Sequence, residues 1–183
     1  MSTKYKTGDN ELAHFVSFAV INWIDALTRP EYKDIIVESV KYCITAKGMK
    51  LHAWVIMNNH VHLILSAGKG FVISHILRDM KKFTSKLIIK TIAENYKESR
   101  REWMLWMFER AGKKSSNNER YQFWQHDNHP IELVNTHMLK QRLDYLHENP
   151  VRAGFVEKAE DWIYSSAADY YCEKKGLIEL NYV

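Results

Sequence analysis

The sequence predicts an α+β fold built on an antiparallel sheet. Two short apolar runs, 51–56 and 60–65, are separated only by Met57-Asn58-Asn59. Asparagine tolerates left-handed backbone angles, so these runs are typical of two strands joined by a hairpin turn. The stretch 71–94 repeats apolar residues at helical spacing. A direct hairpin next to long helical segments favours the α+β class over a parallel sheet.

The remaining elements follow from local patterns. HFVSFAVI, residues 14–21, is rich in Phe and Val and predicts a first strand. Pro30 suits the first turn of a helix, which we expect to run to about Lys47 and to end at Gly48. The expected apolar stripe of the helix over 71–94 consists of Ile73, Ile76, Leu77, Met80, Phe83 (or Thr84) and Leu87.

The second half of the chain alternates polar and apolar segments. We expect a short helix around Trp103 to Arg110, a polar loop over 113–120, a fourth strand over 121–125, a helix over 137–149 that Pro150 stops, and a turn-rich remainder. The first six elements, β-α-β-β-α-β, match a ferredoxin-like split βαβ sheet with helices on one face. The later helices form a C-terminal helical extension, and we expect the other sheet face to be open to a ligand.

Composition indicates an ordinary globular protein. The 183 residues are 46% hydrophobic and fit one domain, 1–183, with a polar N-terminal tail over about 1–11, an insertion over about 97–120 and a C-terminal tail over about 172–183. The net charge of +4 hints weakly at a polyanionic partner. The two cysteines have no CxxC spacing, and no apolar run suits a signal peptide or a membrane helix, so we expect a cytoplasmic protein.

His60 and His62 stand two residues apart in an apolar strand. Residues i and i+2 of a strand point to the same face, so the two imidazoles lie side by side and make half of a metal site. Taken alone, such a pair is more often two satisfied polar groups than a metal site. His126 and His129 are alternative ligands, although a loop position touching phosphate is the better interpretation for them.

The helix over 137–149 supplies the second half of the predicted site. Leu139, Leu143 and Leu146 form its core stripe; at 100° per residue Tyr145 lies about 120° from the centre of that stripe. Asn149, four residues on, shares its side. A tyrosine hydroxyl has a free pKa of about 10 and attacks only a scissile group that a Lewis acid polarises. Tyr145 is therefore either a flanking packing residue or a nucleophile beside a metal.

Three ordered motifs, AWVIMNNHVHLIL, RLDYLHENPVRAGFV and DWIYSS, resemble those of the HUH-class single-tyrosine transposases, in particular the REP-associated tyrosine transposases and IS200-like transposases. The resemblance runs from the first strand to about Tyr171. It implies a metal-dependent single-stranded DNA endonuclease and strand transferase that forms a 5′-phosphotyrosine intermediate on hairpin or repeat DNA. It implies His60, His62 and Asn149 as metal ligands, Tyr145 as the catalytic nucleophile, and Mg²⁺ or Mn²⁺ as cofactor. An imidazole pair also suits softer ions such as Zn²⁺ or Ni²⁺.

Partners and alternatives follow from the same reasoning. We expect single-stranded or hairpin DNA as partner, no membrane, and a monomer or homodimer. On the helix over 71–94, a basic stripe recurs every four residues and is either a solvated face or a DNA-binding surface: Arg78, Lys82, Lys86 and Lys90. Two other functions stay open, a non-catalytic single-stranded nucleic-acid binder of the same fold and a metal phosphoesterase in which water attacks.

Overall fold

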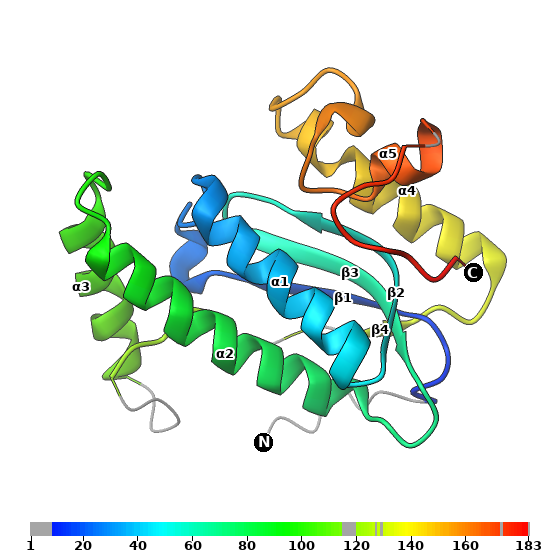
Figure 1. Ribbon diagram of the computed structural model, residues 1–183, viewed down its shortest axis with the longest axis horizontal. Helices are drawn as coiled ribbons and strands as arrows, with labels where there is room; N and C mark the ends of the chain where they lie inside the picture. The colour runs from blue at the N-terminus through cyan, green and yellow to red at the C-terminus, as the bar shows by residue number, and fades with distance from the viewer. Residues whose placement is uncertain (1–8, 115–119, 127, 129, 173, 183) are drawn as a thin grey trace.

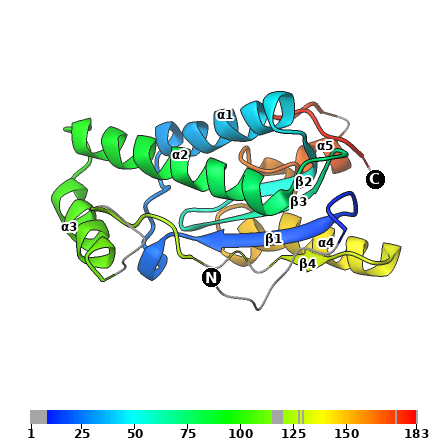
Figure 2. The same cartoon turned by 90° about the horizontal axis from the view of Figure 1, so that it is seen from below.

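Three layers make up the fold. The computed structural model describes residues 9–114, 120–126, 128, 130–172 and 174–182. Its elements are β1 (His14–Ala19), η1 (Ile21–Trp23), α1 (Pro30–Ala46), β2 (Met49–Ile56), β3 (His60–Ala67), α2 (Ile73–Glu94), α3 (Arg101–Gly112), β4 (Ile131–Glu132), α4 (Thr136–Arg152), η2 (Ala159–Asp161) and α5 (Ala167–Tyr171). The helices α1 and α2 cover one face of the sheet, and α4 lies on the other (Figures 1 and 2).

The sheet has the order β2-β3-β1-β4, and every pair is antiparallel. This is the order of a ferredoxin-like sheet, so the predicted fold class is confirmed. The β2–β3 hairpin turns at Met57 to Asn59, as expected. In the central strands Ser17 pairs with His62 and Ala19 with His60. This register sets the histidines directly beside β1.

The predicted fourth strand over 121–125 is wrong. In this segment only Trp124 forms a bridge, to Val20, and the strand β4 is the two-residue segment Ile131–Glu132, which pairs with His14 and Phe15. Phe123 and Trp124 are both buried, although consecutive residues of a strand point to opposite faces. Burial of both aromatic side chains therefore prevents this segment from forming the regular backbone pairing of a strand.

Two hydrophobic cores lie on the two sides of the sheet. The larger, between the sheet and α1 and α2, includes Val16, Phe18, Val61, Leu63 and Leu65. The sequence left open whether Phe83 or Thr84 belongs to the buried stripe of α2. Thr84 is buried and Phe83 is exposed, so Thr84 belongs to it.

The smaller core contains Phe15, Ala53, Val55, Ile64 and Leu146. It lies between the sheet and α4, which contacts both β2 and β3. The expectation of an open second face is therefore wrong. The C-terminal extension closes that face because the leucine stripe of α4 needs an apolar partner.

Helix α4 also continues through Pro150 to Arg152, so the predicted stop at Pro150 is wrong. Proline lacks an N–H and costs one helical hydrogen bond. The carbonyl groups at this point are still used, since Ala153 N–H donates to the Asn149 carbonyl and Phe155 N–H to the Pro150 carbonyl. By contrast, α1 ends where expected, ahead of Gly48 with its positive φ of 68°.

Ser166 ties the chain beyond α4 to the sheet. The Ser166 hydroxyl accepts from Trp54 N–H at 2.9 Å and lies 2.9 Å from Nε2 of His147. Nearer the C-terminus, Asn181 N–H donates to the Leu51 carbonyl at 2.7 Å. Within the described residues 174–182, the chain therefore contacts β2 at Asn181 without forming a strand.

The part of the predicted insertion that is described has a supporting role. Glu98 is buried and forms ion pairs with Arg29 at 2.9 Å and with Arg100 at 3.1 Å. Arg100 also donates to the Asp25 carbonyl and to the Thr28 hydroxyl. The start of this segment thus braces the loop between β1 and α1. No helix within the described ranges is long and apolar enough to cross a membrane.

Acid should destabilise the fold through His147. Burial lowers its pKa from 6.5 to about 4, so the folded state resists a proton that the unfolded chain accepts. Stability is then full above pH 6.5 and falls as the pH drops toward 4, by about 3 kcal/mol at about 1.4 kcal/mol per pKa unit. Urea unfolding from pH 7 to 4 measures this loss. His147→Gln should reduce the pH dependence, and an identical dependence in both proteins would contradict the assignment.

Candidate active site

The two predicted histidines lie on the α4 side of β3. Their ring centroids are 4.8 Å apart, and His62 stacks on Phe15 at 5.2 Å. His62 is only 5% exposed, whereas His60 lies at the edge of the helix–sheet interface and is partly exposed. Residues 60, 62 and 64 of β3 share one face, and Ile64 belongs to the core under α4, so both imidazoles lie on the face that α4 covers.

Helix α4 turns a polar stripe toward them. Tyr145 contacts the His62 ring at 5.4 Å and Phe15 at 6.0 Å, both nearly edge-on. Asn149 places its Oδ1 3.4 Å from Nε2 of His60. The structure therefore brings together the four residues that the sequence predicted to form one site, two from β3 and two from α4.

Two arginines on the same stripe were not predicted. The Arg142 guanidinium lies 5.2 Å from the ring centre of Phe15, and that of Arg152 lies 5.6 Å from the ring of Tyr145. Positions 142, 145, 149 and 152 follow a 3-4-3 spacing, which marks one side of a helix. That spacing was visible in the sequence, and in the fold it sets one positive charge beside the tyrosine and a second beside Phe15, whose ring the tyrosine contacts.

Burial keeps both imidazoles neutral. It lowers the pKa of His62 to about 3, with smaller contributions from His60 and Arg142, and it also lowers the pKa of His60. Neither ring nitrogen of His62 has a hydrogen-bond partner within the described part of the chain. A buried polar atom left unsatisfied costs about 1–3 kcal/mol, so this ring has unused bonding capacity.

Asn59, in the hairpin turn, orients His60. Its Nδ2 donates to the Asp25 carboxylate at 2.8 Å, and its Oδ1 lies 2.7 Å from Nδ1 of His60. Sequence reasoning missed Asp25 because it is 34 positions away from Asn59. Asn59 itself adjoins His60 and forms part of the quoted motif, but its role emerges only from these contacts.

The histidines and Asn149 could supply only part of the coordination shell of a divalent cation. Among the residues described, no group of three or more His, Cys, Asp or Glu side chains could hold a metal ion. Two imidazoles and one amide oxygen are three protein ligands, which leaves coordination positions for substrate or water. The orphaned nitrogens of His62 fit this use.

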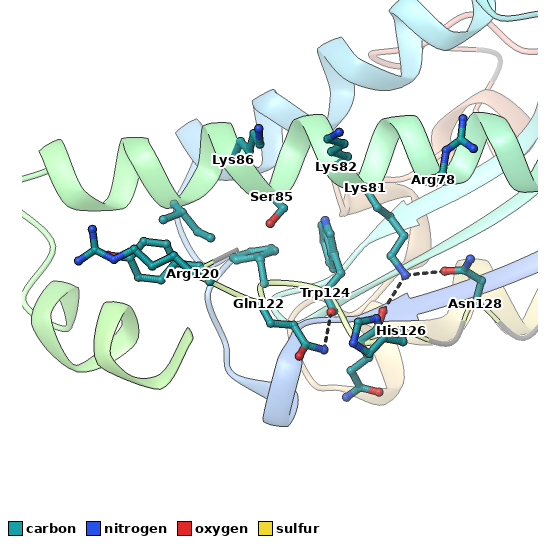
Figure 3. Close-up of a pocket in the computed structure, with 14 residues that line it drawn as sticks. Arg78, Lys81, Lys82, Ser85, Lys86, Arg120, Gln122, Trp124, His126 and Asn128 are labelled. Carbon is teal, nitrogen blue, oxygen red and sulfur yellow. Dashed lines mark hydrogen bonds between the residues drawn. The ribbon is translucent and has the colours of Figure 1, made fainter. Parts of the chain in front are cut away.

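A basic groove runs along α2 on the other side of the sheet (Figure 3). It has a volume of about 660 Å³ and lies between α2 and the extended segment 120–126. Three of the four predicted DNA-binding residues line it, namely Arg78, Lys82 and Lys86. Lys90 lies outside the lining and pairs with Glu94 at 3.9 Å.

The floor of the groove is rigidly held. Lys81 donates to the Gln125 carbonyl at 2.7 Å and to Asn128 Oδ1 at 2.6 Å, and Trp124 Nε1 donates to the Thr84 hydroxyl. His126 lines this groove, far along the chain from the histidine pair, while His129 lies outside the described residues.

Comparisons with known proteins identify the family and the fold. The family model described as "Transposase IS200 like" matches residues 13–141, a range that ends four positions before Tyr145. A solved REP-associated tyrosine transposase, determined bound to a REP hairpin, superimposes with a TM-score of 0.68 at 17% identity over 99% of this chain and 92% of that one. A putative transposase from Deinococcus radiodurans R1 matches with a TM-score of 0.47 at 17% identity, over 81% of this chain and 95% of that one.

No curated protein sequence matches the chain. The family match nevertheless covers well over half of its length and includes the whole ferredoxin-like sheet with the histidine pair. The family match over these residues leads to one conclusion. The chain belongs to the IS200-like transposase family of DNA-processing enzymes.

Proposed function

We propose that the protein is a metal-dependent single-stranded DNA endonuclease and strand transferase that acts on hairpin or repeat DNA through a 5′-phosphotyrosine intermediate. One observation carries the proposal. Tyr145 and Asn149 of α4 meet His60 and His62 of β3 in a single cluster, with Asn149 Oδ1 3.4 Å from His60 Nε2. A candidate nucleophile and a set of electron-pair donors then lie side by side.

The hydrogen bonds around this cluster determine where the protons lie. The Asp25 carboxylate can accept hydrogen bonds but cannot donate them. The Asn59 amide must therefore turn its NH₂ group toward Asp25 and its oxygen toward His60. Nδ1 of His60 therefore carries the proton, and Nε2 carries a lone pair.

Asn149 is oriented in the same manner. Its Nδ2 donates to the Tyr145 carbonyl at 2.9 Å, so Oδ1 faces His60 Nε2. An amide oxygen and an imidazole lone pair thus converge with no proton between them, because burial keeps His60 neutral. A cation satisfies such a pair, and we assign Mg²⁺ or Mn²⁺ to it, with His62 as the third protein ligand.

The chemistry then rests on Tyr145. Its phenol oxygen attacks the phosphorus of a phosphodiester, a Tyr145–O–P bond forms, and the bond from phosphorus to the 3′-oxygen breaks. The phenol gives up its proton, and the departing 3′-oxygen gains one to leave a free 3′-hydroxyl. Arg152, against the Tyr145 ring, and Arg142, against the neighbouring Phe15 ring, are placed to attract the phosphate oxygens. A bound divalent cation would supply the Lewis acid that neutralises charge on the phosphate.

The basic groove provides the binding surface for the DNA. Neither Lys82 nor Lys86 forms an ion pair with any carboxylate among the described residues, so both ammonium groups are available to phosphates. The hairpin bound to the similar solved transposase supports a hairpin or single-stranded partner. The groove alone would also suit the alternative, a non-catalytic nucleic-acid binder, which needs no nucleophile.

The proton assignment can be tested at Asn59. Asn59→Ala removes the acceptor for Nδ1–H, so the proton should move to Nε2, where it can donate to Asn149 Oδ1. Nitrogen-15 NMR of the histidine rings measures the shift, and calorimetry should show Mn²⁺ affinity falling about 10-fold, as for other residues that orient a ligand. Asn58→Ala is the matched control, because its amide contacts Lys33 instead of His60. Unchanged tautomer and affinity in Asn59→Ala would refute the assignment.

Tyr145→Phe tests the enzyme against the binder. It removes one hydroxyl and keeps the ring that packs on Phe15 and His62, so stability and DNA affinity should change little. Cleavage of a labelled hairpin in Mn²⁺ and formation of a denaturation-resistant adduct should both vanish. Tyr164→Phe, whose hydroxyl donates to Asp34, is the control and should keep both. Cleavage by Tyr145→Phe at the wild-type rate would make water the nucleophile.

Salt dependence tests the groove. If its lysines contact phosphates, affinity for a single strand falls steeply with salt, with a slope of about 0.7 per neutralised phosphate. The double variant Lys82→Ala, Lys86→Ala should lower that slope by about 1.4 and weaken all sequences alike. Lys41→Ala on α1, whose ammonium pairs with Glu38, should leave it unchanged. Equal slopes for all three proteins would make the stripe a merely solvated face.

A further inference from the structure

Trp23 stands in an unusual place beside the histidine pair. It is 58% exposed, and its ring centroid lies 5.8 Å from that of His60 at an interplanar angle of 67°. His60 therefore meets the indole at an angle instead of stacking on it. A large aromatic side chain is thus presented to solvent at the edge of the proposed metal site.

The backbone at this point is strained. Asn22 and Trp23 both have a φ of 55°, in the left-handed region. Asparagine adopts this region readily, but a bulky residue with positive φ is a genuine outlier. Such conformations persist only where the surroundings enforce them, and they cluster at ligand-binding and active sites.

Hydrogen bonds and buried residues on both sides of the turn enforce this backbone conformation. The carbonyls of Asn58 and Asn59 accept from Leu27 N–H and Val20 N–H, both at 2.8 Å, and Ile24 and Leu27 are buried. The chain therefore enters the core on both sides of the turn while Trp23 points outward. Burial alone would favour the opposite arrangement, with the tryptophan inside.

The turn is also tied to the metal-ligand candidate. The Asn59 Nδ2 group that binds the Asp25 carboxylate lies 3.5 Å from the Trp23 carbonyl, while Asn59 Oδ1 contacts His60. One amide thus links the backbone of Trp23 to the imidazole of His60. Next to Asn22 a hollow of about 410 Å³ is lined by Arg110 and Lys114, which can attract a phosphate.

We propose that Trp23 is a stacking platform for one nucleobase of single-stranded DNA, adjacent to the phosphate that Tyr145 attacks. An indole face stacks on any base, and stacking of this kind adds affinity without strict sequence choice. The adjoining basic hollow takes the neighbouring phosphate. This inference rests on the proposed function, since it names the part of the substrate that the same site holds.

The test uses a labelled hairpin with single-stranded arms, in which each arm nucleotide is replaced in turn by an abasic one. With wild-type protein, one abasic position should weaken binding about 10-fold. Trp23→Gly should bind the intact hairpin about 10-fold more weakly and should lose nothing further at that position. Glycine adopts the positive φ without strain, so this variant keeps the fold, and its melting temperature should not fall below that of the wild type.

Three comparisons make the result decisive. Trp23→Phe should restore most of the affinity, and Trp103→Ala, which removes a 49% exposed tryptophan from α3, should bind as the wild type does. Calorimetry should show the same Mn²⁺ affinity in Trp23→Gly and wild type. If Mn²⁺ affinity is lost instead, Trp23 only shields His60, and the inference is wrong. An abasic profile identical in wild type and Trp23→Gly also overturns it.

The inference and the proposed function can fail separately. A Trp23-dependent abasic profile without any covalent adduct would retain the platform and reject the nuclease. A covalent adduct with wild-type protein, together with abasic profiles that do not differ between wild type and Trp23→Gly, would retain the nuclease and reject the stacking platform.

Discussion

The packing of α4 on the histidine face of the sheet is the constraint on which the site depends. Leu146 enters the small core beside Phe15 and Ile64, and this apolar contact fixes the rotation of the helix. With that rotation set, the residues at spacing 3-4-3 around Tyr145 face β3. The same contact removes water from His62, so the packing that stabilises the extension also sets the electrostatics of the site.

On the proposed function, this arrangement lowers the stability of the ligand-free protein and raises its affinity for the cation. Two buried ring nitrogens of His62 without partners, and a lone pair of His60 facing an amide oxygen, each cost free energy in the described structure. An apolar residue at position 62 would pack against Phe15 without that cost. Such costs are characteristic of sites built to bind a charged group, where binding the group regains the lost bonds. The amides of Asn59 and Asn149 are held by hydrogen bonds of their own, so little ordering remains for the bound state.

Much of the fold could be predicted from sequence because its signals are local. The Asn-Asn turn, Gly48 and the period of α2 act within a few residues, and all three predictions held. The errors came from long-range packing. The segment 121–125 has strand composition, but Trp124 anchors to Thr84 on α2 instead of forming a regular ladder. Pro150 ends an isolated helix, yet in the folded chain this residue is buried against the rest of the protein and the helix continues. The support from Asp25 could not be predicted, since no local pattern links it to the hairpin turn.

The turn after β1 connects the two surfaces that the proposed function needs. The groove lies along α2 and Tyr145 on α4, and these two helices lie on opposite faces of the sheet (Figure 2). Ile21 N–H donates to the carbonyl of Phe123, a groove residue, while Trp23 two positions later contacts His60. A DNA strand that leaves the groove for the tyrosine must therefore pass over this turn or around the other end of β1. The other end of β1 is less open to a DNA strand, because β4 pairs with β1 there. On the proposed function, the turn that carries Trp23 therefore lies on the path of the DNA between the groove and Tyr145.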